Sequence, residues 1–274
     1  MNRFSINVND ISIIIPVKDN QRGINILLES FFFTQVKDSY PKEFIIVDNN
    51  SKRPIFVKKK YLNKGVNIFI EKCIKKGPAA ARNIGGRKAC GDWLLFIDSD
   101  CVFTESTIRG YLKLEYEGIA YAGKVLPYRQ NIISNFYNSL NLLNPPISIN
   151  DLNQAEYIVT ANCLVNKKIF LQEGGFDETF EIAGGEDVDL GVRLLEKGKI
   201  YYAKNSQVFH DYKNNLFSFY SRFYRYGIGL SMLEKKYNIV VDWMVMLPKN
   251  KGFVNYMLLI LLKLAIKRGK GKYY

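Results

Sequence analysis

The sequence has few of the residues that build disulfide or zinc frameworks. One histidine and four cysteines occur in 274 residues. No CxxC pair or Cys/His cluster is present, and the cysteines are widely separated at Cys73, Cys90, Cys101 and Cys163. Neither a disulfide framework nor a structural zinc site is therefore expected, and reduced thiols in a cytosolic compartment fit this usage.

Long apolar runs are also missing. No stretch reaches the roughly 18 to 20 apolar residues that a membrane-spanning helix needs, and the opening MNRFSINVND lacks the apolar segment of a signal peptide. We expect a chain that stays on the side of the membrane where it is made, in the cytoplasm.

Acidic residues are scarce relative to basic ones, with 26 Asp and Glu against 39 Lys and Arg and a formal net charge of +13. This excess favours anionic partners such as nucleic acid, nucleotide phosphates or an anionic membrane surface. A solvated basic surface without a specific partner is the alternative. No nucleic-acid-binding motif or aromatic-basic platform is present, so nucleic acid is not expected. The 47% of hydrophobic and 24% of charged residues are typical of a globular chain.

Four short apolar segments in the first half have the composition of β-strands. They are ISIIIPV from Ile11, EFIIVD from Glu43, NIFIE from Asn67 and WLLFID from Trp93. Their unbroken β-branched and aromatic character predicts strands that are covered on both faces.

Two helices are predicted between these strands. In GINILLESFFFTQ the apolar residues fall on one helical stripe, at Ile24, Leu27, Leu28 and Phe31. GPAAARNIGGRKA predicts a second helix that opens at Pro78. Alternating strands and helices predict an α/β fold with a mostly parallel sheet. Ligands gather at the carboxyl ends of such strands, where we expect Pro16, Asp48 and Asp98.

The second half has fewer regular segments. IAYAGKVLP from Ile119 and AEYIVTANCLVN from Ala155 are predicted strands. GGEDVDLGVRLLEKG predicts a loop that feeds a helix from Glu186 to Lys197, stopped by Gly198. The expected apolar face of that helix is formed by Val188, Val192 and Leu195.

A pair of aspartates follows the fourth predicted strand. In an extended strand end, Asp98 and Asp100 would point to the same side. Two carboxylates on one side suit Mg²⁺ or Mn²⁺, which prefer oxygen ligands and share them with substrate phosphates. The alternative is one capping carboxylate and one solvated carboxylate.

Further polar residues stand where a nucleotide could bind. Asp48 ends the second strand and could accept hydrogen bonds from a base or ribose, or simply close an Asx turn. Arg82 and Asn83 lie in the first turns of the Pro78 helix and could reach a diphosphate or base carbonyl. That helix could equally be a close-packed crossover in which Gly85 and Gly86 serve packing.

Two more candidates come from the second half. Glu186 and Asp187 stand at a helix start, where a carboxylate could act as a general base or merely cap the helix. His210 is the one histidine, and it is a structural residue, a further metal ligand or a phosphate contact.

Taken in order, these segments resemble the family-2 glycosyltransferases of the GT-A fold from about Ile11 to His210. The matching motifs are IIIPVKDN, SFFFTQ, EFIIVDNNS, GPAAARNIGG, LLFIDSD, GGFDETF and GGEDVDLGVRLLEKG. Each motif alone is weak, but seven in the order and approximate spacing of the family form a specific pattern. The resemblance implies an inverting transfer of a sugar from a nucleotide-sugar donor.

The resemblance also assigns roles to residues. It implies that Pro16, Val17 and Asp19 line the base pocket, that Asp48 contacts the base, and that Arg82 lies close to it. Asp98 would face the ribose and the metal, Asp100 would bind the metal directly, and His210 is a further candidate ligand. Asp187 resembles the base that deprotonates the acceptor hydroxyl, and Glu186 would orient the loop or the acceptor.

The chain departs from the family pattern at two places. Lys18 and Asp19 follow the first proline (Pro16-Val17-Lys18-Asp19), where the family often has Tyr-Asn or a similar pair. Lys52 and Arg53 follow DNNS, where Thr-Asp is common. Neither departure touches the aspartate pair or the Glu-Asp pair.

The C-terminal tail combines apolar and basic residues. From Lys249 it has seven Lys or Arg and no acidic residue around the run YMLLILL. The run is too short to span a bilayer and, with its nearby basic residues, resembles an interfacial anchor: Lys263, Lys267, Arg268, Lys270 and Lys272. A helix packed on the catalytic domain or on a partner chain is the alternative.

These inferences combine into one expectation. Residues 1–235 form a GT-A domain, with a nucleotide-binding half over about 10–105 and an acceptor half over 106–235, and residues 236–274 form a C-terminal extension. The expected activity is metal-dependent transfer from a UDP-sugar to a glycan or lipid-linked acceptor in cell-surface polysaccharide synthesis, with peripheral attachment to the cytoplasmic face of the membrane.

Two alternative functions agree less well with the sequence. A nucleotidyltransferase is less consistent with PVKDNQRG, which lacks a glycine-rich basic loop. A noncatalytic nucleotide-sugar-binding module would lack the base, whereas Asp187 is present.

Overall fold

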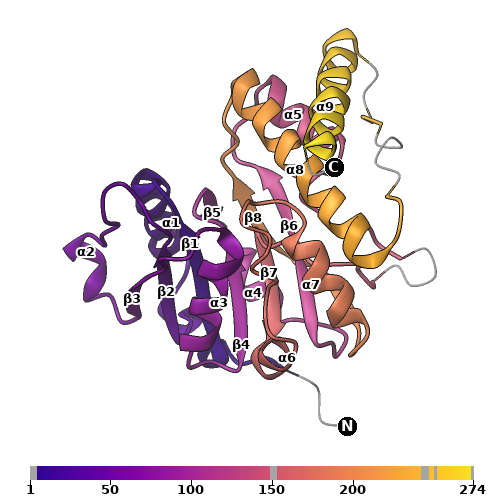
Figure 1. Cartoon of the computed structure of the whole chain (residues 1–274). Helices are drawn as coiled ribbons and strands as arrows, with labels where there is room; N and C mark the ends of the chain where they lie inside the picture. The colour runs from indigo at the N-terminus through magenta and orange to yellow at the C-terminus, as the bar shows by residue number, and fades with distance from the viewer. Residues whose placement is uncertain (1–4, 149–152, 242–246, 250–251, 273–274) are drawn as a thin grey trace.

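The computed structural model describes residues 5–148, 153–241, 247–249 and 252–272. Their strands form one eight-stranded sheet in the order β3-β2-β1-β4-β7-β6-β8-β5, and helices lie on both of its faces (Figure 1). The strands are β1 (Ile11–Val17), β2 (Glu43–Asp48), β3 (Asn67–Lys72), β4 (Trp93–Ile97), β5 (Cys101–Phe103), β6 (Ala120–Pro127), β7 (Asn162–Asn166) and β8 (Ile200–His210). The helices are α1 (Gln21–Thr34), α2 (Lys59–Leu62), α3 (Pro78–Lys88), α4 (Ser106–Tyr111), α5 (Ile132–Ser139), α6 (Lys167–Gln172), α7 (Glu186–Leu195), α8 (Leu216–Tyr237) and α9 (Phe253–Gly271).

The sheet is mixed, and the neighbouring strands β3, β2, β1 and β4 from the first half of the chain are all parallel. Strand β1 runs parallel to β2 and β4, and β2 runs parallel to β3. Strand β7 is antiparallel to β4 and β6, β5 is antiparallel to β8, and β6 is parallel to β8. The carboxyl ends of β1, β2 and β4 therefore meet at one edge, and Pro16, Asp48 and Asp98 lie there as predicted.

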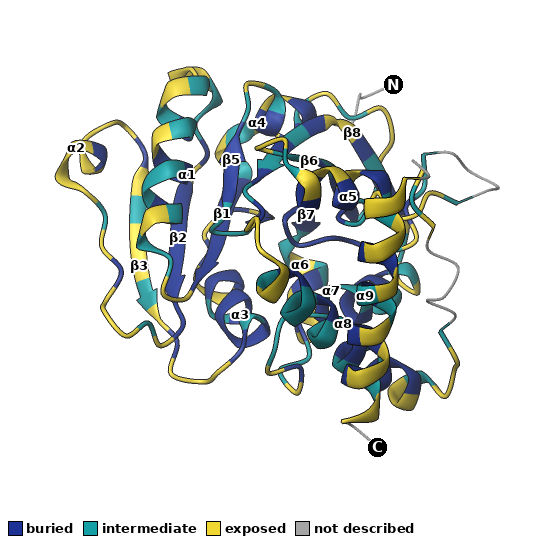
Figure 2. Ribbon diagram, turned by 90° about the horizontal axis from the view of Figure 1, so that it is seen from above, coloured by how far each residue is buried: buried dark blue, intermediate teal, exposed yellow. Residues whose placement is uncertain are grey.

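Each face of β1 belongs to a different apolar core. Because side chains alternate along a strand, Ile13 and Ile15 pack into the core that contains α1, and Ile14 packs into the core that contains α3. Figure 2 shows the buried strands β1 and β2 between these two helices. The predicted stripe of α1 is confirmed, since all four of its residues are fully buried. A Cβ atom on Gly85 would lie 2.4 Å from Ile14 Cγ2, so glycine allows α3 to pack this close to the sheet.

Two strand predictions need correction. NIFIE forms β3, but the prediction that it is covered on both faces is wrong, because β3 is the edge strand and exposes Phe69 and Ile70. The strand predicted from Ala155 begins only at Asn162. Ala155 makes an isolated bridge with Ile147, and four of the next residues line a cavity instead: Tyr157, Val159, Thr160 and Ala161.

The helix predicted from Glu186 is α7, which ends at Leu195, two residues earlier than expected. Its predicted apolar face is wrong. The face that packs in the core contains Leu190 and Leu194, while the three predicted residues are only partly buried: Val188, Val192 and Leu195. The buried side of α7 also contains a charged residue that the apolar pattern does not count, because Asp189 is fully buried and ion-paired to Arg193 at 2.9 Å.

Helices α8 and α9 pack closely against each other through glycines. A Cβ atom on Gly227 would lie 2.2 Å from the carbonyl oxygen of Ile266, and one on Gly269 would lie 2.0 Å from that of Tyr224. The tail helix therefore buries one apolar face in the larger core, and the buried residues include Leu258, Leu259, Leu262, Ala265 and Ile266. In the described residues, no helix combines the length and the apolar character that crossing a bilayer requires.

Candidate active site

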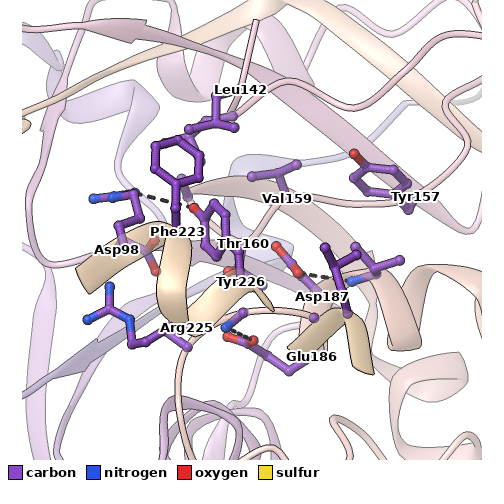
Figure 3. Close-up of a pocket in the computed structure, with 18 of the residues that line it drawn as sticks. Asp98, Leu142, Tyr157, Val159, Thr160, Glu186, Asp187, Phe223, Arg225 and Tyr226 are labelled. Atoms are coloured by element: carbon purple, nitrogen blue, oxygen red, sulfur yellow. Dashed lines mark hydrogen bonds between the residues drawn. The ribbon is translucent and has the colours of Figure 1, made fainter. Parts of the chain in front are cut away.

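A cavity of about 590 Å³ lies at the carboxyl end of β4 and is lined by the start of α7, the end of β8 and one side of α8 (Figure 3). It brings together six of the residues that the sequence singled out: Arg82, Asp98, Asp100, Glu186, Asp187 and His210. Four other candidates do not line it: Pro16, Val17, Asp19 and Asp48. The cavity therefore joins the aspartate pair to the Glu-Asp pair across about 90 residues of sequence.

The aspartate pair lies in a turn, so the expectation of an extended strand end is wrong. The turn is closed by a hydrogen bond of 3.0 Å from the Cys101 amide to the Asp98 carbonyl. It still brings the side chains together, because donor atoms of Asp98, Asp100 and His210 lie within 4.8 Å of one another. Two carboxylates and one imidazole in this arrangement are a donor set that could hold a divalent cation.

His210 is buried at the end of β8 in a form that suits metal binding. Its Nε2 lies 3.3 Å from Asp100 Oδ1, and its ring stacks on Tyr212 with centroids 4.4 Å apart. Burial, together with the positive charge of Arg222, lowers the pKa of His210 to about 3. The imidazole is therefore neutral at pH 7, as a metal ligand must be.

Arg82 of α3 connects the two acidic pairs. Its guanidinium donates to Asp98 Oδ1 at 2.7 Å and to Glu186 Oε1 at 2.9 Å. Burial alone would lower the pKa of Arg82, but the two carboxylates raise it above its ordinary value. Glu186 also accepts a hydrogen bond from the Gly184 amide at 2.7 Å, so it holds the loop that precedes its own helix.

Asp187 follows Glu186 and has different surroundings. Its Oδ1 accepts a hydrogen bond from the Val188 amide at 3.0 Å. Burial and the negative charge of Glu186 raise the pKa of Asp187 to about 7, although Arg82 opposes the shift. A carboxyl group that exchanges its proton near neutral pH and faces a cavity has the properties of a general base.

The four candidates outside the cavity organise the neighbouring edge of the sheet. Pro16 and Val17 are buried at the end of β1. Asp48 accepts hydrogen bonds from the amides of Ser51 at 3.0 Å and Ile55 at 3.1 Å. Desolvation would raise the pKa of Asp48, but these hydrogen bonds hold it below its ordinary value.

Asp19 joins the loops that follow β1 and β2. It has a positive φ of 52° and its Oδ1 accepts from the Lys52 amide at 2.7 Å. Its own amide donates to Ser51 Oγ at 2.8 Å. The two positions that depart from the family pattern are therefore in direct contact with each other.

Sequence reasoning missed the contribution of α8, which lines the cavity with Arg222, Arg225 and Tyr226. No carboxylate of the described chain lies within ion-pairing distance of either arginine. Arg222 lies over the rings of Tyr137 and Tyr212, and burial together with the charge of Arg222 lowers the pKa of Arg225. The segment SRFYRYG, with two arginines one turn apart among aromatic residues, was the available signal.

Comparison with known proteins assigns the family. A family model described as "Glycosyltransferase like family 2" matches residues 12–251. The pre-mycofactocin glycosyltransferase of Mycobacterium tuberculosis is 29% identical over 233 residues, which cover 80% of this chain and 46% of that protein. The chondroitin synthase of Pasteurella multocida is 25% identical over 228 residues, which cover 69% of this chain and 23% of that protein. The chain thus spans about half the length of the mycobacterial relative and about a quarter of the length of the synthase.

Solved structures agree on the fold. S. aureus TarS in complex with UDP superposes with a TM-score of 0.54 at 18% identity, covering 80% of this chain and 65% of that one. The mannosyltransferase PcManGT from Pyrobaculum calidifontis, in complex with GDP-Man and Mn²⁺, superposes with a TM-score of 0.58 at 13% identity. The match covers 96% of this chain and 73% of that chain. The family model covers most of the chain and leads to one conclusion: the chain belongs to the family-2-like glycosyltransferases.

Proposed function

We propose that the protein is a metal-dependent inverting glycosyltransferase that moves a sugar from a nucleotide-diphosphate donor to a hydroxyl group. The observation that carries the proposal is the single cavity that holds both the Asp98, Asp100 and His210 cluster and the carboxyl group of Asp187. One set of residues is suited to a cation and a diphosphate, and the other to proton removal from an acceptor.

The metal site fits Mn²⁺ or Mg²⁺, and the imidazole in the donor set favours Mn²⁺, the softer of the two. When bound, the cation would neutralise charge on the departing diphosphate. Arg222 and Arg225 lie beside this site without carboxylate partners in the described chain, so they are placed to bind the phosphate oxygens. An anion there would also relieve the repulsion between the two guanidinium groups.

Asp187 supplies the base for a single displacement. Its carboxylate would take the proton of the acceptor hydroxyl while the acceptor oxygen attacks the anomeric carbon and the nucleoside diphosphate leaves from the opposite side. Glu186 is not a competing nucleophile, because both of its oxygens are engaged by Arg82 and the Gly184 amide. One free carboxylate on the acceptor side supports inversion at the anomeric carbon.

A uridine nucleotide is the donor that we favour. The ionised carboxylate of Asp48 has lone pairs left beside its two amide contacts and could accept the N3–H of uracil. TarS is bound to UDP and PcManGT to GDP-Man, so related folds accommodate either nucleotide. The membership of chondroitin synthase and an O-antigen biosynthesis protein among the relatives supports a role in cell-surface polysaccharide synthesis.

The test is a panel of UDP-, GDP- and dTDP-sugars assayed for nucleotide release with and without Mn²⁺. Release from one donor that depends on Mn²⁺ is the expected result. Asp100→Ala should weaken donor and metal binding together, whereas Asp187→Asn should spare donor binding and abolish transfer. Full turnover by Asp187→Asn would remove that residue as the base, and metal-independent turnover would remove the cation from the mechanism.

We also propose that the chain works as a peripheral protein at an anionic membrane surface. Helix α9 exposes a stripe of apolar residues opposite its packed face: Phe253, Met257, Ile260 and Leu264. Lys267 and Arg268 are exposed next to this stripe, whereas Lys270 is engaged by Glu234 at 2.7 Å. Apolar side chains flanked by cations bind the boundary of an anionic bilayer.

Flotation with liposomes tests this second proposal. Phe253→Glu with Ile260→Glu should reduce flotation with anionic liposomes at least tenfold and leave the melting temperature unchanged, because both residues are exposed. Ile70→Glu on the exposed edge strand β3 is the matched control. Equal flotation of the two variants would exclude the α9 stripe as the attachment surface.

A further inference from the structure

The cavity has one charged end and one apolar end, and α8 contributes to both. Along one side of α8 the lining residues are, in order, Arg222, Tyr226, Leu230 and Leu233. These positions are spaced by three or four residues, so they form a single stripe on the helix. At about 1.5 Å per residue the stripe extends about 16 Å, and its character changes from cationic to aliphatic along that length.

Other elements add apolar residues to the lining of the cavity. Val241 follows α8, Ile266 comes from the packed face of α9, and Leu142 and Leu143 follow α5. Protein interiors are normally packed to the density of organic crystals, with few spaces larger than a water molecule. A space of this size with an aliphatic lining and a few polar groups at one end has the form of a binding site.

The donor does not account for the apolar end. Its diphosphate is expected at the arginines and the metal cluster, and its base at the edge of the sheet near Asp48, which does not line the cavity. The transferred sugar is polar as well. In Figure 3, the Asp187 carboxylate points into the space bordered by Val159 and Tyr226, so the base lies next to the less polar part of the cavity.

We propose that the apolar end binds the hydrocarbon chain of an acceptor whose hydroxyl group reaches Asp187. The acceptor would be a glycolipid or lipid-linked sugar, in which a polar head and an aliphatic chain are joined. This inference rests on the proposed function, since it names the acceptor of the same site. An aliphatic chain matches the lining better than an aromatic group does, because leucine, isoleucine and valine predominate at this end.

The binding of n-alkyl β-D-glucopyranosides tests the proposal without donor, metal or turnover. Butyl, hexyl and octyl glucoside would be titrated below their micelle-forming concentrations and followed by calorimetry. Each buried methylene should strengthen binding about fourfold, so octyl glucoside should bind about two hundredfold more tightly than butyl glucoside. An affinity that does not change with chain length would overturn the proposal.

Two variants test where the hydrocarbon chain of the ligand binds. Leu142→Gln and Leu230→Gln alter partly buried lining residues. Each should weaken the binding of octyl glucoside at least tenfold and have little effect on the binding of butyl glucoside. Leu171→Gln is the matched control, because Leu171 is 42% exposed on α6 and does not line the cavity. Equal weakening by Leu171→Gln, or none by the lining variants, would refute this location.

The two proposals fail separately. Nucleotide release can fail while glucoside binding retains its dependence on chain length, which would leave the apolar site but remove the reaction. Donor turnover without any such dependence would keep the transferase and reject an acceptor with a hydrocarbon chain.

Discussion

Asp187→Asn is expected to abolish sugar transfer and to stabilise the protein at the same time. The side chain stands at the start of α7 in the cavity, and its pKa is raised from 3.8 to about 7 by burial and by the charge of Glu186. Asparagine has nearly the same shape and carries no charge. The substitution therefore removes both the proton acceptor and the cost of holding a carboxylate in this environment.

The stability gain follows from proton linkage. Because the pKa is higher in the folded state than in the unfolded state, ionisation of Asp187 destabilises the fold as the pH rises from about 4 to about 7. At about 1.4 kcal/mol per pH unit, the full shift corresponds to about 4 kcal/mol. Asp187 is only partly buried, so solvent screening reduces this to about 2 kcal/mol above pH 7. The melting temperature should rise by about 4 to 8 °C at pH 8 and remain unchanged near pH 4.

Catalysis should change in the opposite direction. Loss of a general base typically costs 10²- to 10⁴-fold in rate, and we expect a fall of about 10³-fold in nucleotide release. In the unsubstituted enzyme, the rate should rise with pH through about 7, as Asp187 loses its proton. Thermal unfolding at pH 4 and pH 8 and nucleotide release between pH 5 and pH 9 measure both effects.

Asp189→Asn is a matched control two residues further along α7. Asp189 is fully buried but ion-paired to Arg193 at 2.9 Å and to Lys236 at 2.6 Å. Removing its charge leaves Arg193 without its ion-pair partner and Lys236 with Asp177 alone, and it should lower the stability at pH 8 by about 2 to 4 kcal/mol. If Asp187→Asn also lowers the stability at pH 8, the argument that its carboxylate is held at an energetic cost is refuted.

Three further predictions concern the surroundings of the site. Asp100→Ala should weaken Mn²⁺ binding more than tenfold in calorimetry, and unchanged affinity would exclude this carboxylate as a ligand. Arg82→Gln should lower the free energy of unfolding in urea by about 3 kcal/mol, because it leaves the buried carboxylate of Glu186 without a cation; a loss below 1 kcal/mol would contradict the bridging role. Gly227→Ala should lower the free energy of unfolding by about 1 to 3 kcal/mol, because the added methyl group forces α8 and α9 apart. Gly271→Ala is the control, because its methyl group would meet no atom within 4 Å and should leave the stability unchanged. Equal melting temperatures of the two variants would disprove the close crossing.

The elements that could be predicted from the sequence are those whose apolar pattern or helix start lies within one short segment. β1, α1, β2, α3 and β4 were identified because their apolar patterns and helix starts lie within single short segments. Parallel order then placed Asp48 and Asp98 at one edge of the sheet. The aspartate pair, the Glu-Asp pair and His210 were each chosen from sequence, and the cavity brings them together.

What the sequence could not predict depends on contacts between distant segments. Arg222 and Arg225 reach the cavity because α8 packs against the loop before α7, where a Cβ atom on Gly229 would lie 1.9 Å from the Gly184 carbonyl oxygen. Strand β8 was not predicted because its apolar pattern is interrupted, and its pairing with β6 shifts register after Gly123. The exposure of β3 depends on its edge position, which its composition does not show.

The glycine-mediated crossing of α8 and α9 has a practical consequence for anyone who prepares shortened versions of this enzyme. Ile266 of α9 forms part of the wall of the cavity, and other residues of the same helix pack in the larger apolar core. A truncation before Phe253, made to increase solubility, would remove that wall and expose to solvent the apolar core residues that α9 covers. The last helix should be kept whole and altered only on its outward side.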